Sequence, residues 1–574
     1  MKHTLRCLGS YKKESVLGPL FKLTEAILEL FVPLVVAAII DNGISAGSKS
    51  YVFYAGLILG GLSLVGLACS LTAQYYAARA SVGVARRLRH ELFEHIQALS
   101  YSQLDEAGSS TLITRMTSDV EQVQTGVNLT LRLLLRSPFV VLGAMVMAFT
   151  IDTPSAMVFV VIIPLLAAVV FGIMLASIPM YRKVQAALDR VLAKTRENLS
   201  GARVVRAFGI EEDETEDFRQ RNQQLNLLQR TVGRVSALMN PATYMLINGA
   251  VIVLVWAGAL RVSSGSMSQG QVVAMYNYMS QILVELIKLA NLIININKSI
   301  ACANRIGEVL DSDAGQNVLP SGQPSDSSKA VEFRSVSLSY PGGGDEALTD
   351  ISFSVLPGQT VGVIGGTGSG KSTLVNLIPR FYDATSGTVL VGGQDVMTLD
   401  PTELRRSIGV VPQKAVLFKG TIRENLLWGD ENASDEALDQ AIAVAQATDI
   451  VASKGGLEGE VEQSGRNLSG GQRQRLTIAR ALVRKPDILI LDDSSSALDY
   501  ATDAALRKAL KEMNHQPTTF IVSQRTASIQ HADLILVLDD GELVGSGTHA
   551  QLLDTCSAYR EIHDSQFRKE AAGQ

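Results

Sequence analysis

Apolar residues gather in six long runs in the first half of the chain, separated by polar joints of very unequal length. Each run is close to the ~20 residues that an α-helix needs to cross a bilayer. The runs cover residues 17–40, 53–76, 133–151, 156–179, 239–260 and 272–293. The pattern therefore predicts six membrane-spanning helices. The helix formers and apolar spacing of the long joints predict that these helices continue beyond the bilayer.

Positive charge is concentrated in the two long joints, which follow the second and the fourth run. Short joints such as "DTPS", between the third and fourth runs, carry few positive charges. The positive-inside rule therefore places the long joints and both ends of the chain in the cytoplasm. The basic segment 1–15 is expected either to form an interfacial helix on that face or to be an unstructured tail.

The pattern changes after the sixth run. Residues 311–330 are rich in Pro, Gly and Ser without periodicity, which is typical of a linker. Beyond them, "AVEFRSVSLSY" alternates as a strand does, and "TVGVIGG" reads as a buried strand that runs into glycines. We therefore expect a six-helix all-α transmembrane domain over residues 1–310, a linker over 311–330, and an α/β domain over 331–574.

Composition agrees with a membrane protein. Hydrophobic residues make up 47% and charged residues 19% of the chain, and the mean hydropathy is +0.20. A net charge of −5 argues against a nucleic-acid partner, which would require a basic face. The four cysteines have neither metal-ligand spacing nor a disulfide pattern, and we assign them no role.

The stretch "GGTGSGKST" matches the phosphate-loop pattern G-x-x-x-x-G-K-[ST] and directly follows a predicted strand. Its backbone N–H groups can surround phosphate oxygens at the N-terminus of a helix. We expect Lys371 to reach the β- and γ-phosphates of a nucleotide and Ser372 to ligate Mg²⁺. The predicted ATP-binding residues of this loop are Gly365, Gly366, Thr367, Gly368, Ser369, Gly370, Lys371, Ser372 and Thr373.

Two further motifs are suited to bind the phosphates of a nucleotide or its metal ion. "ILILDD" presents Asp492 at the end of a buried strand, where its carboxylate can hold the metal and its water shell. In "NLSGGQRQR", Ser469 and the amides of Gly470 and Gly471 can cap a helix whose N-terminus attracts an anion. Taken alone, this Ser-Gly-Gly turn is ordinary loop chemistry.

In this order and spacing, the phosphate loop, LSGGQ, the apolar strand with Asp492, "SALD" and the six upstream spans resemble an ABC exporter half-transporter of the multidrug type. The resemblance covers nearly the whole chain and implies a type IV exporter fold and an ABC nucleotide-binding domain with a helical subdomain. It implies that Tyr340 stacks on adenine, and that Gln413 contacts Mg²⁺ and the membrane domain. It also implies coupling helices near residues 101–110 and 201–213, which the sequence alone would leave as solvated helical hairpins.

In the family, two nucleotide domains close head to tail, so each ATP lies between the phosphate loop of one chain and the LSGGQ of the other. The resemblance therefore assigns Ser469, Gly470, Gly471 and Gln472 to the ATP of a partner's site. By the same resemblance, Gln413 joins Ser372 and Asp492 as a Mg²⁺ ligand.

The chain departs from the family pattern at two positions that both concern hydrolysis. Asp493 stands where the general base is normally a Glu, and its side chain is one methylene shorter. Gln524 stands where a switch-loop His is expected, and an amide cannot carry a positive charge or shuttle a proton. The pattern resembles the degenerate-site subunit of a heterodimeric exporter. We expect a second, different half-transporter that carries the catalytic Glu and the switch-loop His.

Ionisable residues inside membrane spans suggest function. Glu285 and Lys288 are candidates for contact with a substrate, although their i, i+3 spacing also suits a local ion pair. Glu25 and Glu29 are expected to have no close partner and are the better candidates for contact with a cationic substrate. The aromatic residues Trp256 and Tyr276 are candidates for an apolar substrate pocket, or for packing and interface anchoring.

The function predicted from the sequence is ATP-driven export of hydrophobic or amphipathic compounds, multidrug-like, from the cytoplasm or inner leaflet across the plasma membrane. The chain would be an ABC-type ATPase and translocase that works with a partner chain, ATP and Mg²⁺ in a lipid bilayer. Two alternatives stay open. One is a homodimeric exporter of a lipid or a peptide, and the other is a non-transporting membrane regulator that senses nucleotide.

Overall fold

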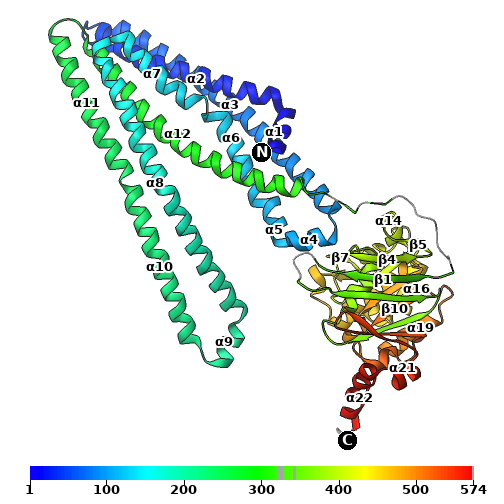
Figure 1. The fold of residues 1–574 in the computed structure, drawn as a ribbon. Coiled ribbons are helices and arrows are strands. Elements are labelled where there is room, and N and C mark those ends of the chain that lie inside the picture. Colours follow the sequence, from blue (N-terminus) through cyan, green and yellow to red (C-terminus); the bar gives the residue numbers. More distant parts are fainter. Residues whose placement is uncertain (314, 317, 320–327, 341–343, 572–574) are drawn as a thin grey trace. The chain divides into compact units, whose positions relative to one another are not determined.

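The computed structural model describes residues 1–313, 315–316, 318–319, 328–340 and 344–571 (Figure 1). The chain divides into two compact units. The first contains Met1–Gln97 and Ser110–Ser312, and the second contains Ala98–Ser109 and Asp313–Gln574. Most of the central part of the predicted linker, residues 320–327, lies outside the described residues.

Six helical stretches of the first unit are long and apolar enough to cross a membrane, which confirms the number predicted from the hydropathy pattern. They extend 42 to 53 residues each, well beyond the apolar runs. Their bounds are Lys2–Ile44, Lys49–Ala98, Ser109–Ile151, Thr153–Ser200, Glu211–Ser263 and Gln269–Leu310. The helices, from the first unit and the stretch that joins the second, are α1 (Lys2–Leu8), α2 (Lys12–Ala38), α3 (Lys49–Ala98), α4 (Tyr101–Ala107), α5 (Ser109–Thr114), α6 (Val120–Leu133), α7 (Arg136–Ile151), α8 (Thr153–Ser200), α9 (Ala202–Phe208), α10 (Glu211–Ala237), α11 (Met239–Ser263) and α12 (Gln269–Leu310).

Polar residues in the short joints start the long helices. The Asp152 side chain accepts a hydrogen bond from the Ser155 amide at 3.0 Å and so caps α8. Ser268 and Gln271 form a reciprocal capping box at the start of α12. Gly270, which lies between these two residues, donates its amide to Asp41 at 2.9 Å.

The N-terminal segment is helical, so the alternative of an unstructured tail is wrong. Its helix α1 buries Cys7 completely in a cluster with Val84, Leu88 and Ile306, which come from α3 and α12. Burial of a small apolar thiol in this cluster gives Cys7 a packing role that its sequence position did not indicate.

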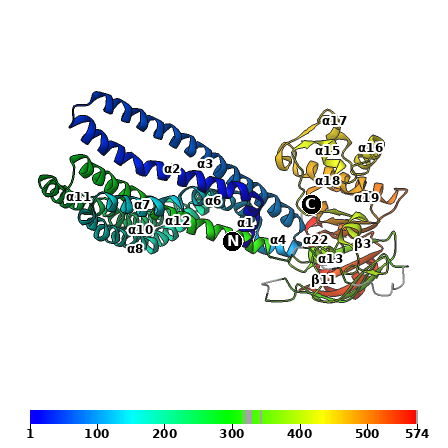
Figure 2. The ribbon, with the colours of Figure 1, turned by 90° about the horizontal axis from the view of Figure 1, so that it is seen from above.

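The second long joint forms a helical hairpin. Helices α8 and α10 pack along each other and are connected through the short helix α9 (Figure 1). The first two long helices, α2 and α3, likewise lie side by side in both views (Figure 2).

The second unit is built around two main β-sheets. One has the strand order β2-β1-β4-β5, and the other has the order β12-β11-β3-β10-β9-β6. Within the six-stranded sheet all neighbouring pairs are parallel except β11 and β12. The strands are β1 (Val331–Leu338), β2 (Leu348–Val355), β3 (Thr360–Gly365), β4 (Ser386–Val391), β5 (Gln394–Asp395), β6 (Ile408–Val411), β7 (Gly420–Thr421), β8 (Glu460–Val461), β9 (Ile488–Asp492), β10 (Thr518–Val522), β11 (Leu534–Asp539) and β12 (Glu542–Gly547).

Helices cover the sheets and form a separate group beside them. α15, α16 and α17 lie together at one side of this unit (Figure 2), and α15 and α16 pack on α18. The helices are α13 (Lys371–Leu377), α14 (Pro401–Arg406), α15 (Ile422–Leu427), α16 (Asp435–Val444), α17 (Thr448–Ser453), α18 (Gly470–Val483), α19 (Tyr500–Lys511), α20 (Thr526–Ile529), α21 (His549–Thr555) and α22 (Ser557–Ala571).

The register of the parallel strands fixes where the functional residues meet. Val522 of β10 pairs with both Val363 of β3 and Asp492 of β9. The carboxyl ends of the three buried strands therefore reach the same edge of the sheet. In open parallel sheets this edge is where ligands bind.

Candidate functional site

The phosphate loop connects the buried strand β3 to α13. A Cβ atom on Gly365 would lie 2.1 Å from the Leu538 carbonyl oxygen and 2.5 Å from Ser369 Oγ. Gly368 and Gly370 adopt φ angles of 87° and 90°, which favour glycine. Gly366, Thr367 and Gly368 are exposed at the crest of the loop, whereas Ser369 is buried beneath them. The loop thus presents backbone groups to a ligand without side chains in the way.

Lys371 begins α13 and is buried. Its Nζ donates to the Gly365 carbonyl at 3.0 Å and also to the Gly366 carbonyl. Burial lowers the pKa of the ammonium group, although the carboxylates of Asp493 and Asp492 oppose the shift. A phosphate bound in the loop would give the Lys371 ammonium group an anionic hydrogen-bond acceptor in place of these two carbonyls.

Ser372 and Asp492 meet where the sequence predicts a metal site. Ser372 Oγ donates to Asp492 Oδ1 at 2.9 Å. Burial raises the pKa of the Asp492 carboxyl, with the hydrogen bond from Ser372 opposing it. A divalent cation would favour the charged carboxylate, and a hydroxyl with a carboxylate is a donor set that suits Mg²⁺. These side chains therefore fit Mg²⁺.

Gln413 and Asp493 lie at the same edge. Gln413 Nε2 donates to Asp493 Oδ2 at 3.4 Å, a long hydrogen bond. Asp493 follows β9 directly and has a left-handed backbone with φ of 46°. Its amide donates to the Val522 carbonyl at 3.0 Å. Gln524 comes two residues after Val522 and is exposed. The structure thus places both departures from the family pattern beside the ends of β9 and β10.

Tyr340, the predicted adenine-stacking residue, lies beside the first turn of α13. Its hydroxyl donates to Thr373 Oγ1 at 3.1 Å. Its ring meets the Tyr382 ring edge to face, with centroids 5.1 Å apart. Tyr382 was not singled out from the sequence, where the stretch "PRFYD" after the phosphate-loop helix was the available signal.

The LSGGQ residues form the N-terminus of α18. Ser469 and Gln472 make a capping box: Gln472 Oε1 accepts from the Ser469 amide at 2.9 Å, and Ser469 Oγ accepts from the Gln472 amide at 3.3 Å. Ser469 and Gly470 are exposed, and Gly471 is half-buried. Over the described residues, no hydrogen bond joins this helix end to the phosphate loop of the same chain.

The first predicted coupling segment groups with the nucleotide-binding unit. Helix α4 belongs to this unit, and its Tyr101 ring stacks on Phe381 with centroids 4.3 Å apart. Asp105 of α4 accepts a hydrogen bond from the Tyr382 hydroxyl at 2.6 Å. Helix α4 of this segment is thus packed within the nucleotide-binding unit and is not simply a solvated hairpin.

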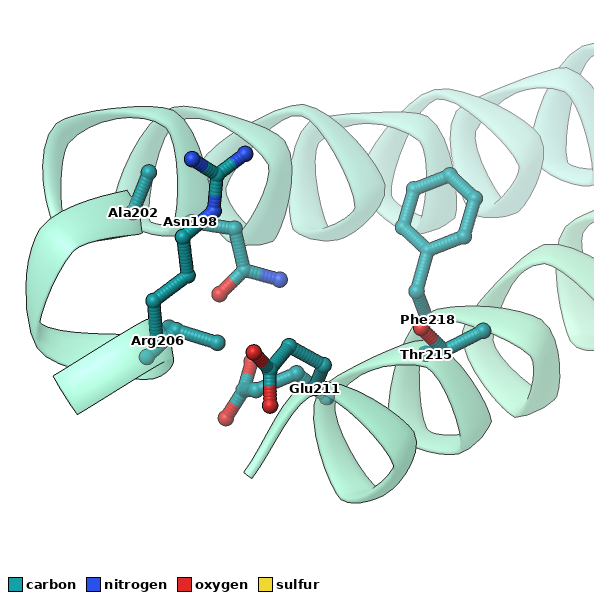
Figure 3. A pocket seen from close by; sticks show the side chains of 8 residues that line it. Asn198, Ala202, Arg206, Glu211, Thr215 and Phe218 are labelled. Atoms are coloured by element: carbon teal, nitrogen blue, oxygen red, sulfur yellow. The ribbon is translucent and has the colours of Figure 1, made fainter. Parts of the chain in front are cut away.

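The second predicted coupling segment, residues 201–213, contains α9 and the start of α10. A cavity of about 290 Å³ lies inside this turn (Figure 3), lined by residues that include Asn198, Arg206, Glu211 and Phe218. The apolar side chain of Phe208 at the end of α9 is 77% exposed. A coupling role for this segment stays a prediction.

The acidic residues of the first span have close partners, which corrects the expectation that they have none. Lys22 Nζ pairs with Glu25 Oε2 at 2.5 Å, and the Lys22–Glu25 spacing of i, i+3 was visible in the sequence. Arg136 of α7 pairs with Glu29 of α2 at 2.5 Å.

The same arginine reaches the sixth span. Arg136 contacts Glu285 of α12 at 2.6 Å, and Ser137 Oγ donates to Glu285 at 2.9 Å. Lys288 pairs with Glu285 at 2.8 Å, as its spacing predicted. We call Glu29, Arg136, Glu285 and Lys288 the intramembrane ion cluster. It joins three helices and has no net formal charge.

The aromatic candidates are distributed differently. Trp256 and Tyr276 are 69% and 46% exposed, and no ring contact between them is present in the described part of the chain. Tyr278, by contrast, is fully buried and donates its hydroxyl to the Leu30 carbonyl. A substrate pocket formed by Trp256 and Tyr276 stays a prediction.

Comparison with known proteins identifies the family. Residues 16–286 match the family model described as "ABC transporter transmembrane region", and residues 348–496 match the model described as "ABC transporter". A Bacillus subtilis protein, the "Uncharacterized ABC transporter ATP-binding protein YfiB", is 38% identical, and the match covers 100% of both chains. The chain belongs to the ABC transporter family. Its C-terminal unit is an ABC ATPase domain, which implies that it binds nucleotide.

Further relatives and one solved structure agree with this assignment. The "Putative multidrug export ATP-binding/permease protein YgaD" of Bacillus subtilis is 31% identical, with 99% of each chain covered. The "ATP-dependent lipid A-core flippase" of Pectobacterium atrosepticum is 29% identical, covering 94% of this ABC transporter and 92% of the flippase. A bacterial Atm1-family ABC exporter, solved with ATP bound, has a TM-score of 0.79 at 23% identity, covering 97% and 98% of the two chains. The ABC transporter therefore has the exporter fold, which confirms the predicted fold class.

Proposed function

We propose that this ABC transporter is one half of a heterodimeric, ATP-driven exporter, and that its own ATP site binds nucleotide but hydrolyses it slowly. One contrast supports this most strongly. The binding residues Lys371, Ser372 and Asp492 converge at the edge of the sheet, whereas Asp493 and Gln524 occupy the two hydrolytic positions. A site that keeps its binding groups and changes both hydrolytic groups is suited to hold ATP.

The residues have separate tasks in this proposal. The loop amides and Lys371 bind the phosphates, Tyr340 stacks on adenine, and Ser372, Gln413 and Asp492 hold Mg²⁺. Bound Mg²⁺ would neutralise phosphate charge. Asp493 must reach the attacking water with a short side chain, and Gln524 offers only neutral hydrogen bonds, so neither promotes proton transfer well. Ser469, Gly470, Gly471 and Gln472, of which the first two are exposed, would complete the ATP site of the second half-transporter.

The cargo we propose is a hydrophobic or amphipathic compound taken from the cytoplasm or the inner leaflet. The names of the relatives, which mention multidrug export and lipid A-core flipping, support an amphipathic cargo. Glu25, Glu29, Glu285, Trp256 and Tyr276 remain the candidate contacts for it. In this proposal the six spans lie in the plasma membrane with both termini and the ATPase domain in the cytoplasm.

A homodimeric lipid exporter is the second candidate. It is favoured by two relatives named "ATP-dependent lipid A-core flippase", which are 29% and 32% identical to this chain. In that case both ATP sites would carry the same Asp and Gln residues.

Purification of the tagged full-length chain from its native membrane, followed by mass spectrometry, tests the proposal. We expect a second half-transporter in equal amount, with Glu after its strand Asp and His in its switch loop. Recovery of this chain only with copies of itself would contradict the heterodimer. ATPase activity that rises when an amphipathic drug panel is added would separate a transporter from a nucleotide-sensing regulator.

A further inference from the structure

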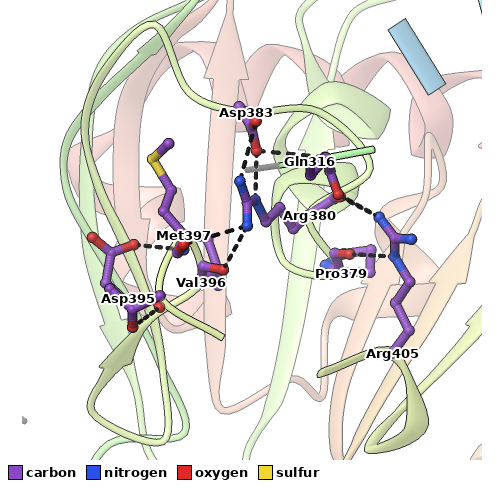
Figure 4. Close-up of polar contacts among 9 residues, drawn as sticks. Gln316, Pro379, Arg380, Asp383, Asp395, Val396, Met397 and Arg405 are labelled. Atoms are coloured by element: carbon purple, nitrogen blue, oxygen red, sulfur yellow. Dashed lines mark hydrogen bonds and ion pairs between the residues drawn. The ribbon is translucent and has the colours of Figure 1, made fainter. Parts of the chain in front are cut away.

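The turn after the phosphate-loop helix, residues 379–383, is fixed by hydrogen bonds of a buried arginine and its neighbours. The Arg380 side chain is completely buried, and its Nε donates to Asp383 Oδ1 at 2.7 Å (Figure 4). The Arg380 carbonyl accepts hydrogen bonds from Arg405 Nη2 at 2.6 Å and from Gln316 Nε2 at 2.9 Å. Buried charges held by several hydrogen bonds of this kind fix the surrounding backbone. The two aromatic residues of the turn therefore project from a rigid base.

On one side, Phe381 and Tyr382 contact helix α4. Tyr101 of α4 stacks on Phe381, and the Tyr382 hydroxyl donates to the Asp105 carboxylate at 2.6 Å. A hydrogen bond to a charged acceptor is short and strong. Burial and the neighbouring Asp105 raise the pKa of the Tyr382 hydroxyl, so it remains a donor over the physiological range.

On the other side, Tyr382 meets the nucleotide site. Its ring stands perpendicular to that of Tyr340, at an interplanar angle of 88°. Tyr340 in turn donates to Thr373, the neighbour of the proposed Mg²⁺ ligand Ser372. A cavity of about 210 Å³ lies between these groups, and its lining includes Tyr340, Tyr382 and Ser102 of α4. The Tyr340 ring therefore has room to change its position when adenine arrives.

We propose that Tyr382 is a positioning residue that links the adenine side of this chain's own ATP site to α4. Nucleotide that stacks on Tyr340 changes the contact between Tyr340 and Tyr382. The Tyr382–Asp105 hydrogen bond carries that change to α4. The link requires binding and not hydrolysis, so a slow site still controls α4. The inference rests on the proposed nucleotide binding and adds a signalling role to it.

Hydrogen–deuterium exchange on the purified full-length assembly tests this link. Exchange is followed in the phosphate loop, residues 365–377, and in α4, with and without Mg²⁺ and a non-hydrolysable ATP analogue. In the wild type we expect both segments to change on binding. In Tyr382→Phe, which removes only the hydroxyl, the loop should still respond. The response of α4 should be lost. Asp105→Asn weakens the same bond and should act in the same direction.

Glu106→Gln is the matched control, because Glu106 is the next carboxylate on α4 and has no recorded contact with Tyr382 among the described residues. It should keep both responses. An unchanged α4 response in Tyr382→Phe, or a wild-type α4 that ignores nucleotide while the loop responds, would overturn the inference. Loss of the loop response in Tyr382→Phe would also overturn it, because Tyr382 would then serve binding itself. A wild-type loop that ignores the analogue would instead refute the proposed function.

Discussion

The residue after β9 combines a chemical and a conformational constraint. Asp493 has a left-handed backbone, and Asp and Asn adopt this conformation more readily than Glu does. Its carboxylate also lies near the amide of Gln413. The side chain thus lies at the edge of the sheet where the proposed function places hydrolysis, but it is one methylene shorter than the Glu of the family pattern. Restoring the longer base alone would therefore act against the local backbone preference.

We predict that the double variant Asp493→Glu with Gln524→His converts the holding site into a hydrolysing one. A correctly placed general base contributes about 10²–10⁴-fold to a rate, so ATP retained by the assembly should be hydrolysed at least about a hundredfold faster. The measurement is the ratio of bound ATP to ADP after a single loading with radiolabelled ATP. Each single variant serves as a comparison and should give a smaller gain. Wild-type protein that retains only ADP would show that the site already hydrolyses.

The glycines of the phosphate loop offer a matched pair. Gly365→Ala should abolish nucleotide binding, because its Cβ would lie 2.1 Å from a backbone carbonyl and 2.5 Å from Ser369 Oγ. Gly366→Ala places its Cβ where no atom lies within 4 Å, so it should bind far better. Titration with a fluorescent ATP analogue, alongside thermal unfolding, measures both effects. Equal loss of binding in the two variants would show that the steric reading of Gly365 is wrong.

At the scale of elements, the intramembrane ion cluster ties together α2, α7 and α12. Arg136 and Glu285 have side chains that are only 7% and 4% exposed. Lys288, by contrast, is 45% exposed. Breaking a buried ion pair by removing one partner costs about 3–5 kcal/mol, because the other charge stays buried. The cluster should therefore depend strongly on Arg136 and weakly on Lys288.

We predict that Arg136→Met destabilises the transmembrane domain by up to roughly 3–5 kcal/mol, the cost of breaking a buried ion pair, because Glu285 would keep only Lys288 and Ser137 as partners. Lys288→Met is the control, since Glu285 would keep its contacts with Arg136 and Ser137. Thermal unfolding of the purified variants in detergent measures the difference. If the two variants melted at the same temperature, Arg136 would not be the centre of the cluster.

The sequence predicts those elements of this ABC transporter whose pattern lies within one short stretch of the chain. Hydropathy predicted six spans, and the phosphate-loop motif placed Lys371 and Ser372 at the N-terminus of the helix that follows a buried strand. The pair of Arg136 and Glu29 joins positions 107 apart in sequence, and only the packing of helices brings them together. Tyr382 and Asp105 are 277 positions apart and depend in the same way on tertiary contacts. The Lys22–Glu25 pair differs from these two, because its i, i+3 spacing on one helix is enough to predict it from the sequence.

At the scale of the whole molecule, the proposed function requires a second chain to complete each ATP site. The LSGGQ helix end is exposed and, across the described residues, makes no hydrogen bond to its own phosphate loop. ATP that bridges two chains stabilises the closed state, because it contacts both only when they are closed. An asymmetric pair therefore uses this chain's LSGGQ for catalysis and its phosphate loop for holding nucleotide.

This asymmetry predicts unequal effects of two substitutions in the same chain. Ser469→Arg replaces the cap of α18 with a bulky side chain at the site that serves the partner's ATP. Loss of one preorganised donor at a reacting group costs about 10²–10³ in rate, so turnover should fall by about a hundredfold or more. Asp493→Asn alters only the slow site and should reduce turnover much less. Steady-state ATPase of the purified assembly measures both. In a homodimer each substitution would affect both sites, so two equally severe losses would favour the homodimeric exporter.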